Sequence, residues 1–266
     1  MPRSIEVSTN IGFWEKSHNK DSEGSLKYLS GEEGIEEMTV PDGFTVNLFA
    51  DESMFPELVN PVQLSTDTSG RLWAAVWNNY PRWDPHTKME DALLIFRDDD
   101  KDGGADRAVT FAKVPNPTAF EFWNGGVLIA SQPDNWFLKD TDGDDVADEK
   151  VIYLNGLGSA DSHHGASNFI YGPDGGIYWQ SGIFLVNNIE HPYGSSFQVE
   201  EAGMFRFDPR QFTIQFLSHD GLNPCGNSFD QWGYQYSTDA TSGECYQFML
   251  DKGALKMHWM LNKTVR

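Results

Sequence analysis

The sequence lacks several features that would assign it to a familiar class. No run approaches the roughly 20 apolar residues that a membrane-spanning helix needs, and the first residues carry no apolar segment typical of a signal peptide. No Cys-x-x-Cys pair occurs, so the chain encodes neither a zinc knuckle nor a covalently attached c-type haem. Its two cysteines, Cys225 and Cys245, either pair in an oxidising compartment or remain buried thiols in adjacent strands, and buried thiols are favoured.

Basic residues are also scarce. The chain has 19 lysines and arginines against 40 aspartates and glutamates, a formal net charge of −21. Such an acidic chain repels the phosphates of a nucleic acid unless a local basic patch exists, and the sequence shows none. The composition therefore argues against a nucleic-acid partner.

A glycine turn that opens a short apolar run recurs four times along the chain. These glycines are Gly70, Gly126, Gly176 and Gly233. An Asn-Pro pair precedes three of them, with the proline nine residues before the glycine, at Pro61, Pro117 and Pro224. Short strands repeated with a period near 50 residues are typical of a radial array of sheets. The sequence thus predicts an all-β fold, a β-propeller with about four blades.

The repeats suggest three parts. Residues 1–39 are expected to form a polar arm or linker with one short helix near Glu32–Met38, residues 40–246 the blades, and residues 247–266 a tail without the pattern. A propeller closes its ring so that no sheet edge stays exposed. Four repeats therefore predict an open, incomplete arc.

A second repeat consists of acidic loops. LIFRDDDKDGGAD from Leu94 matches WFLKDTDGDDVAD from Trp136 at a constant offset of 42 residues, and each loop should join two strands of one blade. Carboxylates at alternate positions direct several oxygens at one point, which suits Ca²⁺. The predicted ligands are Asp98, Asp100, Asp102 and Asp106 in the first loop and Asp140, Asp142, Asp144 and Asp148 in the second. Solvated acidic turns are the alternative, but the repulsion between these carboxylates favours a bound cation, with the second loop the better site.

The segment SADSHHGASNF from Ser159 holds the candidate catalytic residues Asp161, His163 and His164. An imidazole is the natural general base for an alcohol, and Asp161 could orient one ring. Neighbouring side chains of an extended segment point to opposite faces, so only His164 is expected to face the channel. The alternative is a pair of polar loop histidines bonded to backbone carbonyls.

The pattern around His164 resembles a known family. His164 is followed eight residues later by Gly-Pro-Asp-Gly and an aromatic strand, which resembles the signature of the soluble quinoprotein glucose and sorbosone dehydrogenases. Those are six-bladed propellers that hold pyrroloquinoline quinone and calcium at the channel mouth. The resemblance implies that His164 takes a proton from a sugar or alcohol as hydride passes to the quinone. It also implies an exported, periplasmic protein.

Longer segments are similar to planctomycete and related bacterial proteins described as membrane-bound dehydrogenases. They are VPDGFTVNLFADE from Val40, NPVQLSTDTSGRLWAAVWNNYP from Asn60, LKDTDGDDVADE from Leu138 and GLNPCGNSFDQWG from Gly221. Asn223 matches an asparagine that contacts the quinone, whereas Leu222 stands where the family has an arginine. The resemblance further implies later blades and a cytochrome c domain, which this chain lacks. Two alternatives stay open: a non-catalytic, calcium-stabilised propeller that binds a glycan or protein, and a lactonase-like hydrolase.

The aromatic loop WNNYPRWDP gives weaker information. Trp77, Tyr80 and Trp83 could stack on a sugar ring at the channel mouth, or they could be packing residues of a long loop between strands. The sequence does not separate these two interpretations.

Overall fold

The computed structural model describes residues 29–78, 80, 91–194, 196–219 and 221–248. Over these residues the protein is almost entirely β-structure. The exceptions are a six-residue helix α1 (Gly31–Glu36), whose N-terminus is closed by a capping box from Ser30 to Glu33, and the 3-10 turn η2 (Ser162–His164). The short helix thus lies within the expected polar arm. No helix in the described ranges is long and apolar enough to cross a membrane.

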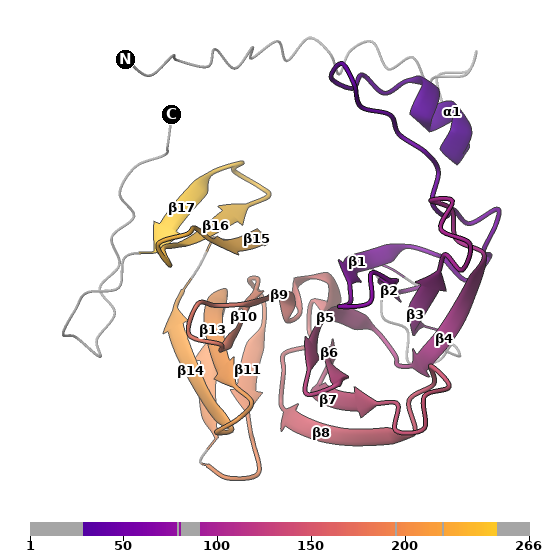
Figure 1. Cartoon of the computed structure of the whole chain (residues 1–266). Helices are drawn as coiled ribbons and strands as arrows, with labels where there is room; N and C mark the ends of the chain where they lie inside the picture. Colours follow the sequence, from indigo (N-terminus) through magenta and orange to yellow (C-terminus); the bar gives the residue numbers. More distant parts are fainter. Residues whose placement is uncertain (1–28, 79, 81–90, 195, 220, 249–266) are drawn as a thin grey trace.

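The strands form four consecutive antiparallel sheets, which we call blades 1 to 4 (Figure 1). Blade 1 contains β1 (Pro61–Thr66), β2 (Leu72–Val76), β3 (Ala92–Arg97) and β4 (Arg107–Lys113). Blade 2 contains β5 (Pro117–Trp123), β6 (Gly126–Ser131), β7 (Asp134–Lys139) and β8 (Glu149–Asn155). Blade 3 contains β9 (Ser167–Tyr171), β10 (Ile177–Ser181), β13 (Gly203–Asp208) and β14 (Thr213–Ser218), with the hairpin β11 (Val186–Ile189) and β12 (Phe197–Glu200) inserted. Blade 4 contains β15 (Pro224–Phe229), β16 (Gln235–Asp239) and β17 (Cys245–Phe248).

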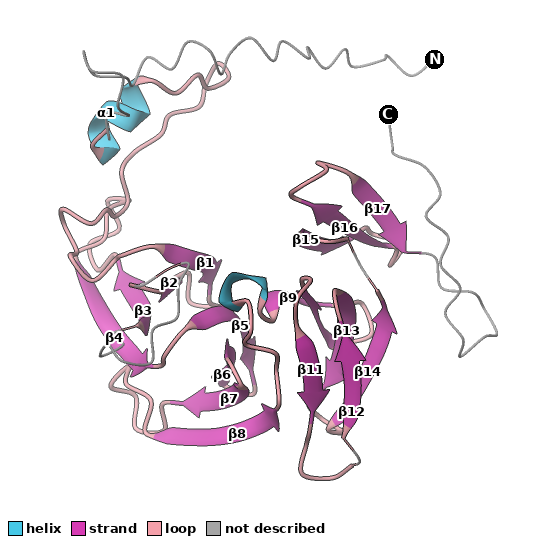
Figure 2. Cartoon of the chain, turned by 180° about the vertical axis from the view of Figure 1, so that it is seen from behind, coloured by secondary structure: helices cyan, strands magenta, loops and turns pink. Residues whose placement is uncertain are grey.

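The blades are arranged as an open arc. The first strands of the blades follow one another around the inside, with β1 beside β5, β5 beside β9 and β9 beside β15. Figures 1 and 2 show that β15–β17 and blade 1 stand apart at the two ends of this arc. Both the four-blade β-propeller arrangement and the open ring predicted from the repeat are therefore confirmed over the described part of the chain.

The repeated glycines serve two different local purposes. Gly70 and Gly233 have φ of 80° and 82°, a left-handed conformation that most side chains avoid. In blade 2 the left-handed residue is instead Gly125, and Gly126 lies so close to the carbonyl of Leu138 that a Cβ would overlap it. The same sequence motif therefore fixes a turn in some blades and a close strand contact in another.

Apolar side chains fill the space between blades. Blades 1 and 2 share a cluster that includes Trp73, Ile95 and Phe120, and blades 2 and 3 share one that includes Leu128 and Trp179. Because neighbouring residues of β6 point to opposite sheet faces, this strand contributes to both clusters. The outer face of blade 1 packs against residues 49–58. This packing fixes the blades against one another, so the polar turns between their strands lie at the two ends of the strands.

The cysteines differ from their predicted state. Cys225 lies on β15 and is exposed, whereas Cys245 lies on β17 and is partly buried. Strand β16 separates them, and both thiols are free. The expectation of buried thiols in adjacent strands was wrong, because one strand of blade 4 lies between the two cysteines.

Candidate functional site

The strands divide the functional residues between two opposite faces. Each inner strand starts at one face and ends at the other, so β9 starts at Ser167 beside the histidines and ends at Tyr171. We call the first face the histidine face. The β3–β4 and β7–β8 loops, which carry the aspartates, lie at the other face, because β1 and β5 end there and the strands alternate in direction. We call it the acidic face.

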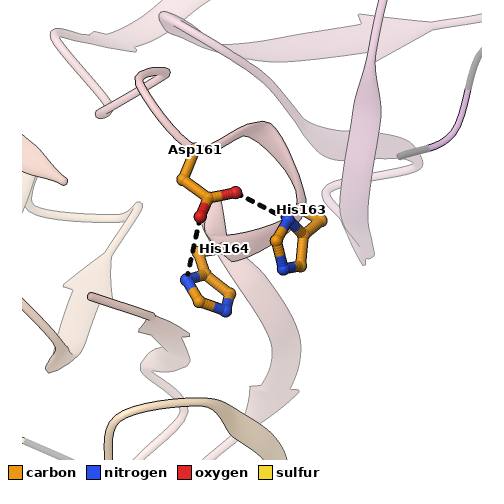
Figure 3. A group of neighbouring side chains, drawn as sticks. All are labelled: Asp161, His163 and His164. Atoms are coloured by element: carbon orange, nitrogen blue, oxygen red, sulfur yellow. Dashed lines mark ion pairs between the residues drawn. The ribbon is translucent and has the colours of Figure 1, made fainter. Parts of the chain in front are cut away.

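Asp161 holds the two histidines on one side of a tight turn (Figure 3). Its Oδ1 lies 2.6 Å from Nδ1 of His163 and its Oδ2 lies 3.5 Å from Nδ1 of His164. The two ring centroids are 4.2 Å apart. Both Nε2 atoms therefore lie on the side of the rings away from the carboxylate, as Figure 3 shows.

The predicted separation of the two histidines to opposite faces was wrong. Residues 162–164 form a 3-10 turn, not the extended segment on which the prediction rested. The turn brings His163 and His164 to the same side, where Asp161 contacts both rings instead of one. Asp161, His163 and His164 therefore form one group of side chains in contact.

His164 is the more rigidly held of the two. Its side chain is 9% exposed, against 39% for His163. Its Nδ1 lies 3.2 Å from the carbonyl oxygen of Ile183, and its ring stacks on Phe184 with the centroids 6.5 Å apart. Both neighbours of this Nδ1 are acceptors, so of the two neutral tautomers the one with the proton on Nδ1 satisfies them and leaves the lone pair on Nε2.

Buried polar residues of blade 2 anchor the histidine segment. The hydroxyl of Thr118 donates to the carbonyl of Ala166 at 2.6 Å, and Gln132 donates to that hydroxyl at 2.7 Å. The amide of Asn116 donates in turn to Gln132. Sequence reasoning missed these residues as parts of the site. The repeated Asn116-Pro117 pair was the available signal, because it marks the strand start on which this network is built.

Asp91 continues this network beneath the strand starts of blades 1 and 2. Burial raises its pKa, although the backbone N–H groups of Asn116 and Asn78, which both donate to the carboxylate at 2.8 Å, partly counteract the effect. The carboxylate therefore joins the segment after β2 of blade 1 to the segment before β5 of blade 2.

Asn223 lies at the same face. Strand β15 begins directly after it, and the carbonyl of Leu222 accepts a hydrogen bond from Ile183, the residue whose own carbonyl faces His164. The backbone N–H of Asn223 donates to Asp239 at 2.9 Å. The structure thus brings this residue to the rim that carries the histidines.

The aromatic loop gives a mixed outcome. Trp77 is buried and its ring meets that of Tyr80 edge-on at 5.1 Å, so Trp77 is a packing residue. Tyr80 is exposed, and Trp83 lies outside the described residues.

The acidic loop 140–148 gathers three carboxylates. Asp140, Asp142 and Asp144 each present an oxygen within 4.8 Å of the others. The backbone N–H of Gly143 lowers the pKa of Asp140, whereas the carboxylate of Asp144 raises the pKa of Asp142. This repulsion is what a bound cation would relieve.

The fourth aspartate of that loop has a different role. Asp148 accepts hydrogen bonds from the backbone and the hydroxyl of Thr141, at 3.1 and 2.5 Å, and so closes the base of the loop. It stands outside the group of three carboxylates.

The loop 98–106 has the same framework. Asp98, Asp100 and Asp102 again lie within 4.8 Å of one another, and Asp106 accepts from the backbone of Asp99 at 2.7 Å. One carboxylate oxygen of Asp98 is buried and has no hydrogen-bond donor among the described residues. The 42-residue sequence repeat is therefore a repeat of loop geometry.

The loops differ at their sixth position, where Gly103 corresponds to Asp145. The carboxylate of Asp145 pairs with Arg71 at 2.6 Å and also with Arg97, both from blade 1. The second loop is thus tied to the neighbouring blade. No motif pointed to this link, because the partners are distant in sequence.

Comparison with known protein families matches residues 30–265 to a family described as a domain of unknown function, DUF7133. The chain belongs to this family. A comparison with curated proteins found no match.

The solved structures similar to this DUF7133 chain match it only at low identity. One is the holo form of the pyranose dehydrogenase PQQ domain from Coprinopsis cinerea, at 12% identity and a TM-score of 0.46, covering 68% of this chain and 43% of that one. Another is a gluconolactonase from Xanthomonas campestris, at 13% identity and a TM-score of 0.41, covering 82% of this chain and 60% of that one. The chain therefore spans less than two thirds of the length of either protein.

The described histidine face does not fit pyrroloquinoline quinone well. The quinone is a tricarboxylate and needs cationic partners. The described arginines all pair with aspartates at the acidic face; they are Arg71, Arg97, Arg107, Arg206 and Arg210. Among the described lysines only Lys113 lies at the histidine face, because it is the last residue of β4. That strand is the outermost strand of blade 1.

Proposed function

We propose that the Asp161–His163–His164 group is a general-base site in a dehydrogenase-like propeller that acts on a sugar or another alcohol. The observation that carries this proposal is the position of His164, whose Nδ1 faces two acceptors while Nε2 is left as a proton acceptor. The sugar-type substrate and an exported location follow from the resemblance of the His-x8-Gly-Pro-Asp-Gly pattern, and they are part of the proposal.

The residues present account for one chemical step, the removal of a proton from a hydroxyl. The hydroxyl donates to Nε2 of His164, and the resulting imidazolium is stabilised by the Asp161 carboxylate and the Ile183 carbonyl at Nδ1. For oxidation of a sugar alcohol, the described residues supply only this base, and the hydride would have to pass to an added acceptor such as a quinone. A water molecule deprotonated here would attack a lactone, which is the hydrolase alternative.

Activity assays separate these reactions. The chain is supplied with Ca²⁺, pyrroloquinoline quinone, a redox dye and a panel of sugars, and separately with gluconolactone in a pH-stat. Turnover in either assay should fall about 100-fold or more in His164→Ala, and less in Asp161→Asn, whereas the control His191→Ala should retain it. Turnover that survives His164→Ala would contradict the general-base role.

A spectroscopic measurement tests the site without turnover. Long-range ¹H–¹⁵N spectra should show His164 protonated at Nδ1 in its neutral form. A neutral His164 protonated at Nε2 would overturn the proposal, since no proton acceptor would then face the open side.

The second candidate is a calcium-stabilised propeller without catalysis. It is favoured by the absence of arginine from the described histidine face and by Leu222 at the position where the resemblance expects one. Under this proposal the carboxylate groups of loops 98–106 and 140–148 hold Ca²⁺ and fix the outer strands of blades 1 and 2. Calcium-dependent stability together with an inactive chain in both assays would support it.

A further inference from the structure

The acidic face contains a cavity of ≈ 490 Å³ between blades 1 and 2. It lies where the β1–β2 turn, the β5–β6 turn and loop 140–148 meet, and Tyr171 at the end of β9 borders it. Its volume is in the range of about 300–1,000 Å³ typical of small-molecule sites. Because β9 begins beside the histidines and ends at Tyr171, the cavity is separated from the histidine group by the length of that strand.

One side of the cavity is aromatic. Trp73 meets Phe111 at 4.7 Å and Phe122 at 5.3 Å, both edge-on, and Phe122 is the partly exposed member of this apolar group. Tyr171 is exposed at the border, where its hydroxyl donates to the carbonyl of Phe122 at 2.6 Å, whereas the Trp123 ring packs against the cluster between blades 2 and 3. Phe122 and Tyr171 are therefore the rings that a ligand can reach.

The other side is a network of ion pairs, to which Asp140 adds one further carboxylate. Arg71 bonds to Asp67 at 2.6 Å and to Asp145 at 2.6 Å, and Asp145 also pairs with Arg97. Burial opposes ionisation of Asp67, but hydrogen bonds from the Trp73 indole and from Arg71 outweigh it and lower its pKa. Two arginines and two aspartates thus neutralise each other while presenting both donors and acceptors.

The geometry points to a site for a neutral saccharide in this cavity. A pyranose has apolar C–H faces that pack on aromatic rings and hydroxyls that both donate and accept, which matches the two walls. An anion would meet the carboxylates of Asp67, Asp140 and Asp145 and is disfavoured, whereas a neutral saccharide can donate to these oxygens and accept from Arg71. This inference does not depend on the function proposed for the histidine group.

Binding can be measured on the full chain with defined probes. Cellobiose, maltose and xylobiose serve as neutral saccharides, glucuronate as an anion and choline as a cation. We expect at least one neutral probe to quench tryptophan fluorescence saturably, with a dissociation constant on the order of 1 mM or lower, and the charged probes to bind at least about tenfold more weakly. In ¹H–¹⁵N spectra the same probe should shift the indole signal of Trp73, which donates to Asp67 in the cavity, and not that of Trp232.

Variants locate the site. Tyr171→Ala should weaken binding by about tenfold or more, Tyr171→Phe should largely preserve it because the ring remains, and Trp232→Ala, a control in blade 4 at a 77% exposed residue, should leave it unchanged. If Tyr171→Ala fails to fold, the indole shifts in the unsubstituted chain still decide the question. The inference is overturned if no neutral probe binds saturably, if the shifted indoles lie outside the cavity, or if glucuronate or choline binds more tightly than every neutral probe.

Discussion

At the scale of single residues, Glu121 shows how a buried carboxylate sets a pH dependence. Burial raises its pKa, with the hydrogen bond from the Phe122 backbone acting in the opposite direction. A carboxylate whose pKa is higher in the folded state holds its proton more tightly there. Its contribution to stability is therefore fully present below the unfolded pKa and is lost as the pH rises through the folded pKa.

Glu121→Gln should remove the loss of stability at higher pH. The amide oxygen can still accept the hydrogen bond from the Phe122 backbone, while the buried negative charge is gone. The gain in unfolding free energy over the unsubstituted chain should be larger near pH 7 than near pH 4. Urea denaturation across this range measures it, with Glu149→Gln, at an exposed residue of β8, as the control. A gain that is the same at every pH would contradict the assignment.

Two left-handed glycines make a matched pair for backbone effects. Gly156 has φ of 86° and a Cβ there would overlap the carbonyl of Asn188, whereas Gly70 has φ of 80° with no atom within 4 Å. Gly70→Ala should cost about 1–2 kcal/mol for the left-handed conformation alone. Gly156→Ala should cost about 1–3 kcal/mol more, because the chain must also move. Equal losses in urea denaturation would show that the contact at Gly156 relaxes freely.

At the scale of elements, the two acidic loops should respond to calcium unequally. A 100-fold excess of Ca²⁺ over its dissociation constant would add about 2.7 kcal/mol, which raises the melting temperature by several degrees. Loop 140–148 should account for most of this, so Asp142→Ala should reduce the shift more than Asp100→Ala. In calcium-free protein Asp142→Ala should instead stabilise, because Asp144 no longer faces a second carboxylate.

Titration of chelated protein with Ca²⁺, followed by thermal unfolding, measures the effect, and Mg²⁺ is the control cation. The calcium proposal fails if the melting temperature does not move, or if Asp142→Ala shows the same shift as the unsubstituted chain.

At the scale of the whole molecule, the open arc predicts self-association. Blade 4 has three strands in the described residues, with β17 at its edge, and nearby Trp232 and Tyr234 are 77% and 52% exposed. An unpaired edge is a template for another strand, but the net charge of −21 opposes association at low salt. Sedimentation equilibrium should therefore show association that increases with protein concentration and with salt. A strict monomer with fully protected amides in β17 would contradict this.

The sequence by itself determined the features that depend on local chemistry. Glycines at Gly70 and Gly233 specify left-handed turns, apolar runs between them specify strands, and the 42-residue repeat specifies two loops of like geometry. These follow from conformational preferences that act over a few residues, which is why the four blades and the acidic loops could be predicted.

Only the tertiary structure decided what those elements bring together. The orientation of His163 and His164 depends on the 3-10 turn at residues 162–164, which is followed at Ala166 by a hydrogen bond from Thr118 of another blade, so alternation along the chain gave the wrong result. Asp145 meets arginines 74 and 48 residues away, and the cavity beside it exists only where two blades meet. Such contacts arise from packing between sheets, and the spacing of residues along the chain does not encode them.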